Sequence, residues 1–131
     1  MIVAYTDGSS RGGPAGWAVL IEGELYSDWL AYATNNEAEL YAVLQAVMLC
    51  PAWEQLLIRT DSKLAIGWLS LGWRIRKQHN LGLVKVYFDV CHAKDLTVRF
   101  EHVHGHSGDP RNEKVDRAAH AQAGIALALQ E

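Results

Sequence analysis

The sequence predicts an α/β fold with a mixed five-stranded sheet, whose first three strands are antiparallel and whose two faces are both covered by helices. Two observations support this fold class. Three β-prone segments follow one another within the first 30 residues, with only short turns between them. Helical and β-prone segments then alternate, and helical crossovers of this kind connect parallel strands. With 131 residues, the chain is expected to form a single domain, residues 1–131.

The strands are expected where β-branched, aromatic and aliphatic residues occur in short runs between turn-forming residues. The second and third strands form a hairpin around Glu22-Gly23-Glu24, and the last strand alternates apolar and polar side chains. The five predicted strands are residues 1–7, 16–22, 24–30, 55–60 and 96–103.

The first helix is the best marked, because apolar residues recur on one face of residues 35–49. Thr34 with Glu37 fits a capping box at its start. Asn36 with Glu39 fits a capping box as well, and the sequence leaves both alternatives open. The other predicted helices are residues 62–71, 80–93 and 112–128, and the Ala- and Leu-rich end, 121–131, is expected to fray.

The charges are distributed unevenly along the chain. The formal net charge of −3 argues against binding to nucleic acid through overall charge alone. Residues 62–88, however, contain five Lys and Arg residues and no Asp or Glu. This asymmetry predicts a basic face beside an acidic pocket.

The N-terminus and the cysteines indicate the compartment. Met1-Ile2-Val3 runs directly into a strand, without the basic and apolar segments of an export signal or a membrane anchor. Cys50 and Cys91 occur in neither CxxC nor His-linked spacing, so they are expected to be buried free thiols. We therefore expect a cytoplasmic protein that does not bind membranes.

Two β-prone runs end in the same way, and this repetition is the strongest functional signal. One run ends in Thr6-Asp7-Gly8-Ser9 and the other in Thr60-Asp61-Ser62, which places an acid at the C-terminal end of each predicted strand. If the strands lie side by side and parallel, Asp7 and Asp61 share one corner of the sheet, where their charges repel unless a cation lies between them. The repetition predicts a metal-dependent enzyme.

Two further acids could join this corner, each from the expected first turn of a helix. They are Glu39 in the helix over 35–49 and Asp116 in the last helix. Each also has a structural explanation, because acidic side chains stabilise helix N-termini. Carboxylate oxygens suit Mg²⁺ or Mn²⁺, whereas histidine or thiolate ligands would indicate zinc.

Four motifs, in the same order, give residues 1–122 a resemblance to ribonuclease H type 1. They are Thr6-Asp7-Gly8-Ser9, Thr34-Asn35-Asn36 with Glu39, Thr60-Asp61-Ser62, and His106-Ser107-Gly108 with Asn112 and Asp116. The resemblance implies the ribonuclease H-like fold and endonucleolytic hydrolysis of the RNA strand of RNA/DNA hybrids. It also implies two Mg²⁺ ions, replaceable by Mn²⁺, and products with 5′-phosphate and 3′-hydroxyl ends.

The resemblance assigns the site residues one by one. The metal ligands are Asp7, Glu39, Asp61 and Asp116. Glu39 is preferred to Glu37, because the family's glutamate follows the second Asn by three residues. His106 matches the histidine of the loop before the last helix, which is thought to assist proton transfer or product release. The alternating His102, His104 and His106 also permit a zinc site, although no cysteine accompanies them.

Substrate contacts are expected on both sides of the acids. Short polar residues next to the acids could recognise the 2′-hydroxyl of RNA. Such residues also build turns and helix caps. The residues are Gly8, Ser9, Thr34, Asn35 and Asn36. Trp73 could stack on sugars while Arg74 and Arg76 contact phosphates. Gly72–Arg76 resembles the short turn of family members that lack the long basic protrusion called the handle.

Two other functions remain open. The fold could carry an inactive site and serve as a nucleic-acid binding module, or it could belong to a nuclease or strand-transfer domain that acts on DNA. The presence of all four acids disfavours the first, and the Thr34-Asn35-Asn36 segment disfavours the second. We expect a monomer with no obligate protein partner, whose substrate is the RNA/DNA hybrid.

Overall fold

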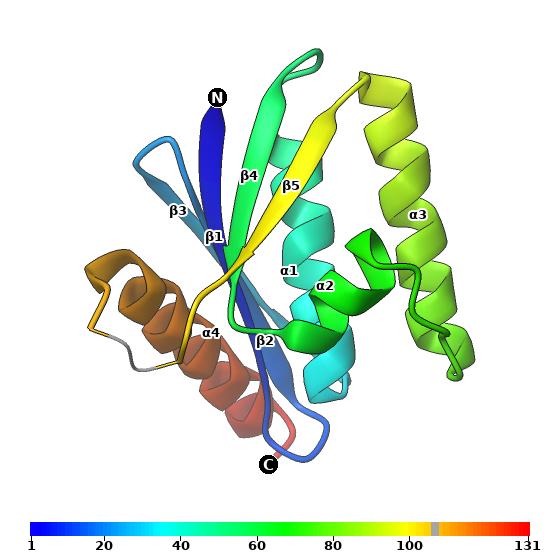
Figure 1. Cartoon of the computed structure of the whole chain (residues 1–131). Coiled ribbons are helices and arrows are strands. Elements are labelled where there is room, and N and C mark those ends of the chain that lie inside the picture. The colour runs from blue at the N-terminus through cyan, green and yellow to red at the C-terminus, as the bar shows by residue number, and fades with distance from the viewer. Residues whose placement is uncertain (106–107) are drawn as a thin grey trace.

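The computed structural model describes residues 1–105 and 108–131, which contain five strands and four helices. In chain order they are β1 Ile2–Ser10, β2 Ala15–Ile21, β3 Glu24–Leu30, α1 Asn35–Leu49, β4 Gln55–Thr60, α2 Lys63–Ser70, α3 Gln78–Lys94, β5 Thr97–His102 and α4 Pro110–Leu129. The strands form one sheet in the order β3-β2-β1-β4-β5 (Figure 1). β3, β2 and β1 are antiparallel, and β1, β4 and β5 are parallel, which confirms the predicted fold class.

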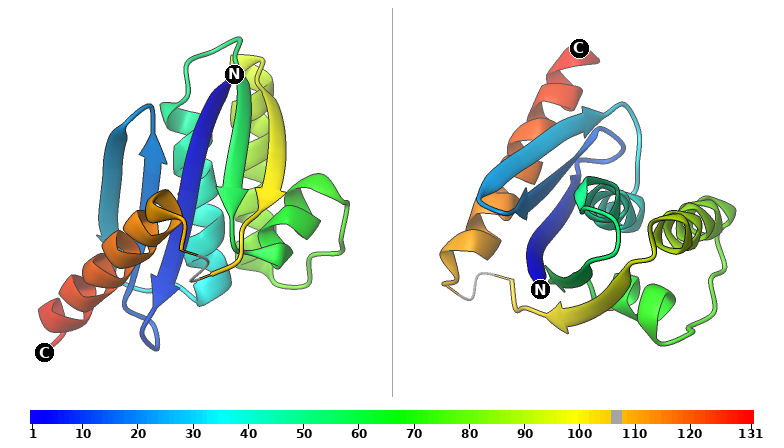
Figure 2. Two further views of the ribbon diagram at one scale, coloured as in Figure 1. Left: turned by 60° about the vertical axis from the view of Figure 1, so that its left-hand side comes forward. Right: turned by 90° about the horizontal axis from the view of Figure 1, so that it is seen from above.

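Helices cover both faces of the sheet, as expected. α4 packs on one face, and α1, α2 and α3 lie on the other, which the view from above in Figure 2 shows most clearly. Side chains alternate between the two faces along β1: Ala4 belongs to the larger core beneath α1 and α3, whereas Tyr5 packs with Val115 and Ala119 of α4. The sheet is therefore buried between two helical layers.

β1 is longer than predicted, and this changes the position of Asp7. The parallel pairing with β4 ends at Tyr5 and Arg59, but the antiparallel pairing with β2 continues to Ser10 and Ala15. The prediction that Asp7 ends its strand is therefore wrong. Asp7 lies inside β1, at the point where β1 separates from β4, because the ladder with β2 keeps the segment after Asp7 extended.

The start of α1 decides between the two possible capping boxes. The Glu37 main-chain N–H donates to Thr34 Oγ1 at 3.1 Å, and the Thr34 N–H donates to Glu37 Oε1 at 3.2 Å. The box therefore consists of Thr34 and Glu37, and Glu39 is left for another role. α1 spans the predicted residues 35–49.

The last helix is longer than expected at both ends. α4 begins at Pro110 behind the N-cap Asp109 and continues to Leu129, through most of the segment that was expected to fray. Gln130 Nε2 donates to the main-chain oxygen of Ala31 at 2.7 Å, so the end of the chain contacts the segment that leaves β3.

Residues 71–77 alone connect α2 to α3, which fits the short turn expected in place of a handle. Cys50 and Cys91 are both free. Cys50 is buried, as expected, whereas Cys91 is only partly buried, so the expectation of a buried thiol was wrong for Cys91. Within the described ranges, none of the helices combines the length and apolar character that a membrane crossing requires.

Candidate active site

Four elements converge at the corner of the sheet where β1 separates from β4. β1 and β4 are adjacent and parallel, as the repeated motif requires, with Asp7 in β1 and Asp61 directly after β4. Glu39 and Asp116 come from α1 and α4, on opposite faces of the sheet. Both lie beyond the first helical turn, which contains Glu37 in α1 and Glu113 in α4, so the first-turn placement was wrong. Stabilisation of a helix N-terminus therefore does not explain them.

Three of the four predicted carboxylates form a compact group. Asp7, Glu39 and Asp61 each offer one carboxylate oxygen, and these oxygens all lie within 4.8 Å of one another. Gly8 permits this approach, because a Cβ at Gly8 would lie 2.4 Å from the main-chain N of Glu39. The main chain of β1 can therefore lie directly against α1, which brings Glu39 to Asp7.

Asp7 is buried and Glu39 and Asp61 are partly buried, which disfavours negative charges on the group. Asp7 is only 4% exposed. Burial, together with the charge of Asp61, raises the pKa of Asp7 to about 8. Burial and the charges of Asp7 and Asp61 also raise the pKa of Glu39 well above its ordinary value. Carboxylates that repel one another in this way favour either protons or a cation between them.

The donor set fits a divalent cation with oxygen ligands. Glu39 Oε2 is buried without a hydrogen-bond partner among the described residues, so a potential ligand atom is left unsatisfied. Mg²⁺ and Mn²⁺ prefer ligands of this type. Within the described part of the chain, this trio is also the one group of three or more His, Cys, Asp and Glu residues that could hold a metal ion.

Asp116 lies beside Asp7 as the outer member of the site. Its carboxylate acts on Asp7 and contributes to the raised pKa of that residue. It is not part of the compact trio, its side chain is 31% exposed, and its Oδ1 lies 3.3 Å from His120 Nδ1. The structure thus brings the four predicted carboxylates together, with Asp7, Glu39 and Asp61 in the compact trio and Asp116 outside it.

The histidines give no support to a zinc site in the described residues. The rings of His102 and His104 lie edge to face, 5.1 Å apart, and His102 Nε2 is 3.2 Å from the main-chain oxygen of Asp61. His102 thus closes the end of β5 against the loop that carries Asp61. His106, the predicted loop histidine, lies outside the described residues.

The short polar residues next to the acids have clear structural roles. Ser9 is buried in β1 behind Gly8, and Thr34 caps α1. The main-chain N–H of Ser10 donates to Asn35 Oδ1 at 2.8 Å, which connects the end of β1 to the start of α1. The turn-and-cap explanation therefore accounts for the side chains of Thr34 and Asn35.

The remaining predicted substrate residues line one cavity. Its volume is about 280 Å³, and its walls come from α1, α2, the 71–77 connection and α3: Asn36, Leu64, Trp68, Trp73, Arg74, Arg76, Lys77 and Asn80. The structure thus joins Asn36 to the basic segment, which the sequence could not show because these residues are far apart along the chain. Trp73 is 47% exposed, and its main-chain N–H donates to the Gly67 oxygen.

Asn80 and Lys77 line this cavity but were not predicted as substrate contacts. Asn80 is 3% exposed, and its Oδ1 is buried without a hydrogen-bond partner among the described residues. Its place in a helical, acid-free segment carried no signal of a buried amide. Lys77, by contrast, directly follows Arg76 and could have been included with the arginines.

Proteins of known family resemble this chain along nearly its whole length. A profile of the RNase H family matches residues 1–124. A ribonuclease H of Thermus thermophilus is 37% identical over an alignment that covers 93% of this chain and 83% of that protein. The ribonuclease H of Nitratidesulfovibrio vulgaris is 35% identical, with 93% of this chain and 88% of that protein covered.

The fold recurs in solved structures. The N-terminal RNase H domain of a Mycobacterium tuberculosis protein, fused to maltose-binding protein, has a TM-score of 0.83 and 24% identity, over 99% of this chain and 98% of that one. LC11-RNase H1, solved in complex with an RNA/DNA hybrid, has a TM-score of 0.82 and 22% identity, over 97% and 99%. These two structures show the fold. The profile match and the two ribonucleases H of 35% and 37% identity show that the chain belongs to the RNase H family and is a hydrolase of the ribonuclease H type.

Proposed function

We propose that this ribonuclease H cuts the RNA strand of RNA/DNA hybrids internally, with two Mg²⁺ ions that Mn²⁺ can replace, and leaves 5′-phosphate and 3′-hydroxyl ends. The compact group of Asp7, Glu39 and Asp61, with oxygens within 4.8 Å of one another, is the observation that carries the proposal. A similar fold has been solved with an RNA/DNA hybrid, which supports this substrate.

The four carboxylates would hold the ions. Asp7 is the central ligand, since the other three acids surround it, and Glu39 offers its unsatisfied Oε2. When bound, the ions would supply Lewis acidity for the attacking water and the leaving 3′ oxygen. The protein contributes fixed carboxylate positions and a partly dry corner, in which charge interactions are stronger than in water.

The cavity lined by Asn36 and the basic segment would hold the nucleic acid to one side of the acids. Arg74 and Arg76 can contact phosphates, and the exposed face of Trp73 can stack on a sugar. Because Ser9 is buried, and Thr34 and Asn35 are hydrogen-bonded within the fold, Asn36 is the polar side chain of the predicted set that opens on this cavity. Contacts from Gly8 to the RNA would come from its main chain.

The rest of the proposal rests on the resemblance and the composition. His106 would assist proton transfer or product release from the loop before α4. The protein would act in the cytoplasm as a monomer without an obligate protein partner, and its free thiols suit a reducing compartment.

A cleavage assay on three labelled duplexes tests the proposal. Purified protein is incubated with RNA/DNA, RNA/RNA and DNA/DNA duplexes, with and without Mg²⁺. We expect internal cuts in the RNA strand of the hybrid alone, dependent on the metal, and ligatable 5′-phosphate ends. Cleavage of DNA/DNA would support the DNA nuclease instead, and hybrid binding without any cleavage would support the binding module.

A further inference from the structure

A chain of polar contacts connects three strands to the first turn of α4, on the face of the sheet that α4 covers. Arg59 of β4 lies between Tyr5 of β1 and Glu101 of β5 in the strand register. Arg59 Nε donates to Glu101 Oε1 at 3.1 Å, and Arg59 Nη1 donates to Tyr5 Oη at 2.7 Å. Tyr5 Oη in turn donates to Asp109 Oδ2 at 3.2 Å. We call Tyr5, Arg59 and Asp109 the α4 clamp.

Asp109 connects the clamp to the helix itself. It is the N-cap of α4, and its Oδ1 accepts a hydrogen bond from the Arg111 main-chain N–H at 2.9 Å. One carboxylate thus caps the helix with one oxygen and binds Tyr5 with the other. The guanidinium carbons of Arg59 and Arg111 lie 5.5 and 5.3 Å from the centre of the Tyr5 ring, within the range of cation–π attraction.

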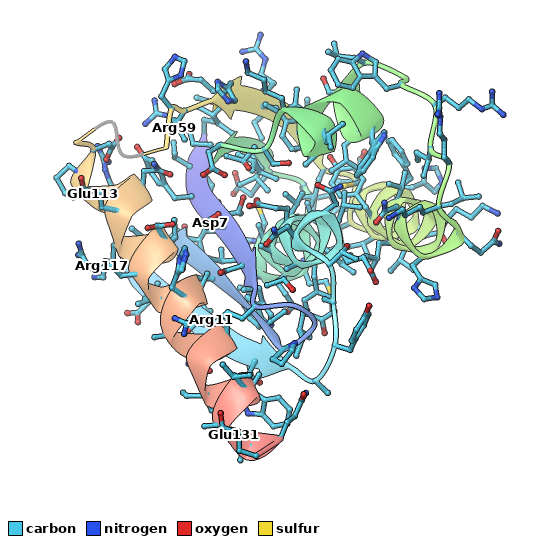
Figure 3. The ribbon with its side chains drawn as sticks, turned by 90° about the horizontal axis from the view of Figure 1, so that it is seen from below. Asp7, Arg11, Arg59, Glu113, Arg117 and Glu131 are labelled. Carbon is cyan, nitrogen blue, oxygen red and sulfur yellow. The ribbon has the colours of Figure 1, made fainter. Side chains whose placement is uncertain are left out.

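The clamp residues of β1 and β4 lie close to two of the acids along the chain. Tyr5 precedes Asp7 by two residues within β1, so both belong to the same side of that strand, and Arg59 is two residues before Asp61, which follows the end of β4. Tyr5 is 2% exposed, and its ring packs with Val115 of α4. Figure 3 shows Arg59 near the N-terminal end of α4 and Asp7 alongside the helix.

A second anchor holds the middle of α4. A Cβ at Gly16 of β2 would lie 2.4 Å from the main-chain oxygen of Ala119, so the main chain of α4 lies directly on the sheet there. Asp116 lies between this anchor and the clamp at Asp109. Because Asp116 is outside the compact trio, its distance from Asp7 depends on where α4 sits rather than on the packing of β1 against α1.

We propose that Tyr5 and Arg59 are positioning residues for the ribonuclease H reaction, which hold the first turn of α4 on the sheet and thereby keep the Asp116 carboxylate beside Asp7. The inference rests on the proposed function, in which Asp116 is the fourth metal ligand. A small displacement of a ligand is enough to lower a turnover rate strongly. The nucleic-acid cavity lies on the opposite face of the sheet and is untouched by the clamp.

Tyr5→Phe tests the inference, because it removes only the hydroxyl group and keeps the packed ring. We expect kcat to fall about tenfold while KM for the hybrid is unchanged, and the Mg²⁺ concentration for half-maximal activity to rise several-fold. Tyr87→Phe is the matched control, since Tyr87 is also buried but lies in α3 on the other face. It should leave all three quantities unchanged.

Two further variants separate positioning from loss of structure. Asp109→Ser keeps a helix cap, but the serine side chain is too short to reach Tyr5, so this variant should reproduce the effect of Tyr5→Phe. The variant with both substitutions should have a kcat no lower than that of either single variant. Arg59→Met serves if Tyr5→Phe is poorly folded, with Arg99→Met on β5 as its control.

A binding measurement shows whether the clamp acts through Asp116. Calorimetric titration should show that Mg²⁺ binds more weakly to the Tyr5→Phe variant than to the unaltered protein. In the Asp116→Asn background, however, Tyr5→Phe should leave Mg²⁺ binding unchanged. Unchanged kcat and Mg²⁺ dependence in Tyr5→Phe, or an equal loss in Tyr87→Phe, would overturn the inference. The proposed function is tested separately, by whether the unaltered protein cleaves the hybrid at all.

Discussion

At the level of single residues, the buried carboxyl group of Asp7 dominates the electrostatics of the site. It is 4% exposed, and Asp61, Glu39 and Asp116 all act on it. In the metal-free protein, burial and the charges of Asp61 and Asp116 disfavour the ionised form of Asp7, and the hydrogen bond with Glu39 offsets only part of this effect. The same residue is thus a source of instability without a cation and, in the proposed function, the central ligand with one.

This conflict predicts that Asp7→Asn stabilises the metal-free protein in a pH-dependent way. The pKa of Asp7 is raised from 3.8 to about 8 in the folded protein. The stability of the folded protein with a neutral Asp7 is therefore fully present below pH 3.8, decreases as the pH rises above 3.8, and is lost once the pH has risen through 8. Asn has no such loss. We expect the variant to be more stable by about 2 kcal/mol at pH 8.5 and nearly equal to the original at pH 4.

Urea unfolding in the presence of EDTA, at both pH values, measures the difference. The exposed Asp89 of α3 offers a control, since Asp89→Asn should change the unfolding free energy little at either pH. A stability gain of the same size at pH 4 and pH 8.5 would contradict the raised pKa.

Asp61→Asn should abolish cleavage without loss of the fold. In the proposed function, removal of one of the three grouped carboxylates takes away both a ligand and part of the negative charge that would attract the cation. We expect the rate of hybrid cleavage in Mg²⁺ to fall by at least about 100-fold, with an unchanged circular dichroism spectrum. Substantial remaining activity would argue against Asp61 as a ligand, and Asp89→Asn again gives the matched charge control.

At the level of elements, the site depends on how closely β1 approaches α1. A Cβ at position 8 would lie 2.3 Å from the carbonyl carbon of Ala38. That carbon belongs to the main chain of α1, so it cannot move aside as the end of a flexible side chain could. Gly8→Ala must therefore move β1 away from α1 and separate Glu39 from Asp7. We expect a destabilisation of about 1–3 kcal/mol and a large loss of cleavage activity, measured by thermal unfolding and the hybrid assay.

Gly82→Ala provides the control for this prediction. Gly82 lies in α3, where an added Cβ would meet nothing within 4 Å, so the substitution should stabilise the helix slightly. Equal melting temperatures for Gly8→Ala and the original protein would show that β1 and α1 tolerate the extra group.

Element order and type followed from the sequence, whereas the lengths of β1 and α4 did not. The helix over 35–49 has an apolar face and a capping box, which are local signals. The last residues of β1, Gly8 to Ser10, have no strand preference of their own and are extended because β2 pairs with them. Local patterns contain no information about such partners.

At the level of the whole molecule, the charge asymmetry of the sequence corresponds to a group of basic side chains that line one cavity. Arg74, Arg76 and Lys77 of the acid-free segment line the cavity with Asn36, whereas Lys63 and Lys85 do not. The predicted basic face is thus narrower than the acid-free segment and comes mainly from the connection between α2 and α3.

Replacement of Arg74 and Arg76 by Ala should weaken hybrid binding and flatten its dependence on salt. If each arginine neutralises one phosphate, the slope of log K against log salt concentration should fall by about 1.8. Titration of labelled hybrid at several salt concentrations, with Ca²⁺ present to prevent turnover, measures the slope. An unchanged slope would reject these contacts, and Lys85→Ala with Arg99→Ala removes two charges outside the cavity as the control.

The sequence by itself determined the fold class and the order of the elements, and its four motifs singled out the four carboxylates. Those features depend on hydrophobic periodicity, caps and short motifs, which are local along the chain. The tertiary structure decided that Asp7 is buried inside β1, that Asp116 stays outside the compact trio, and that Asn80 joins Asn36 in one cavity. Burial, pKa and mutual distance depend on segments that meet only in the folded chain, so no local pattern could specify them.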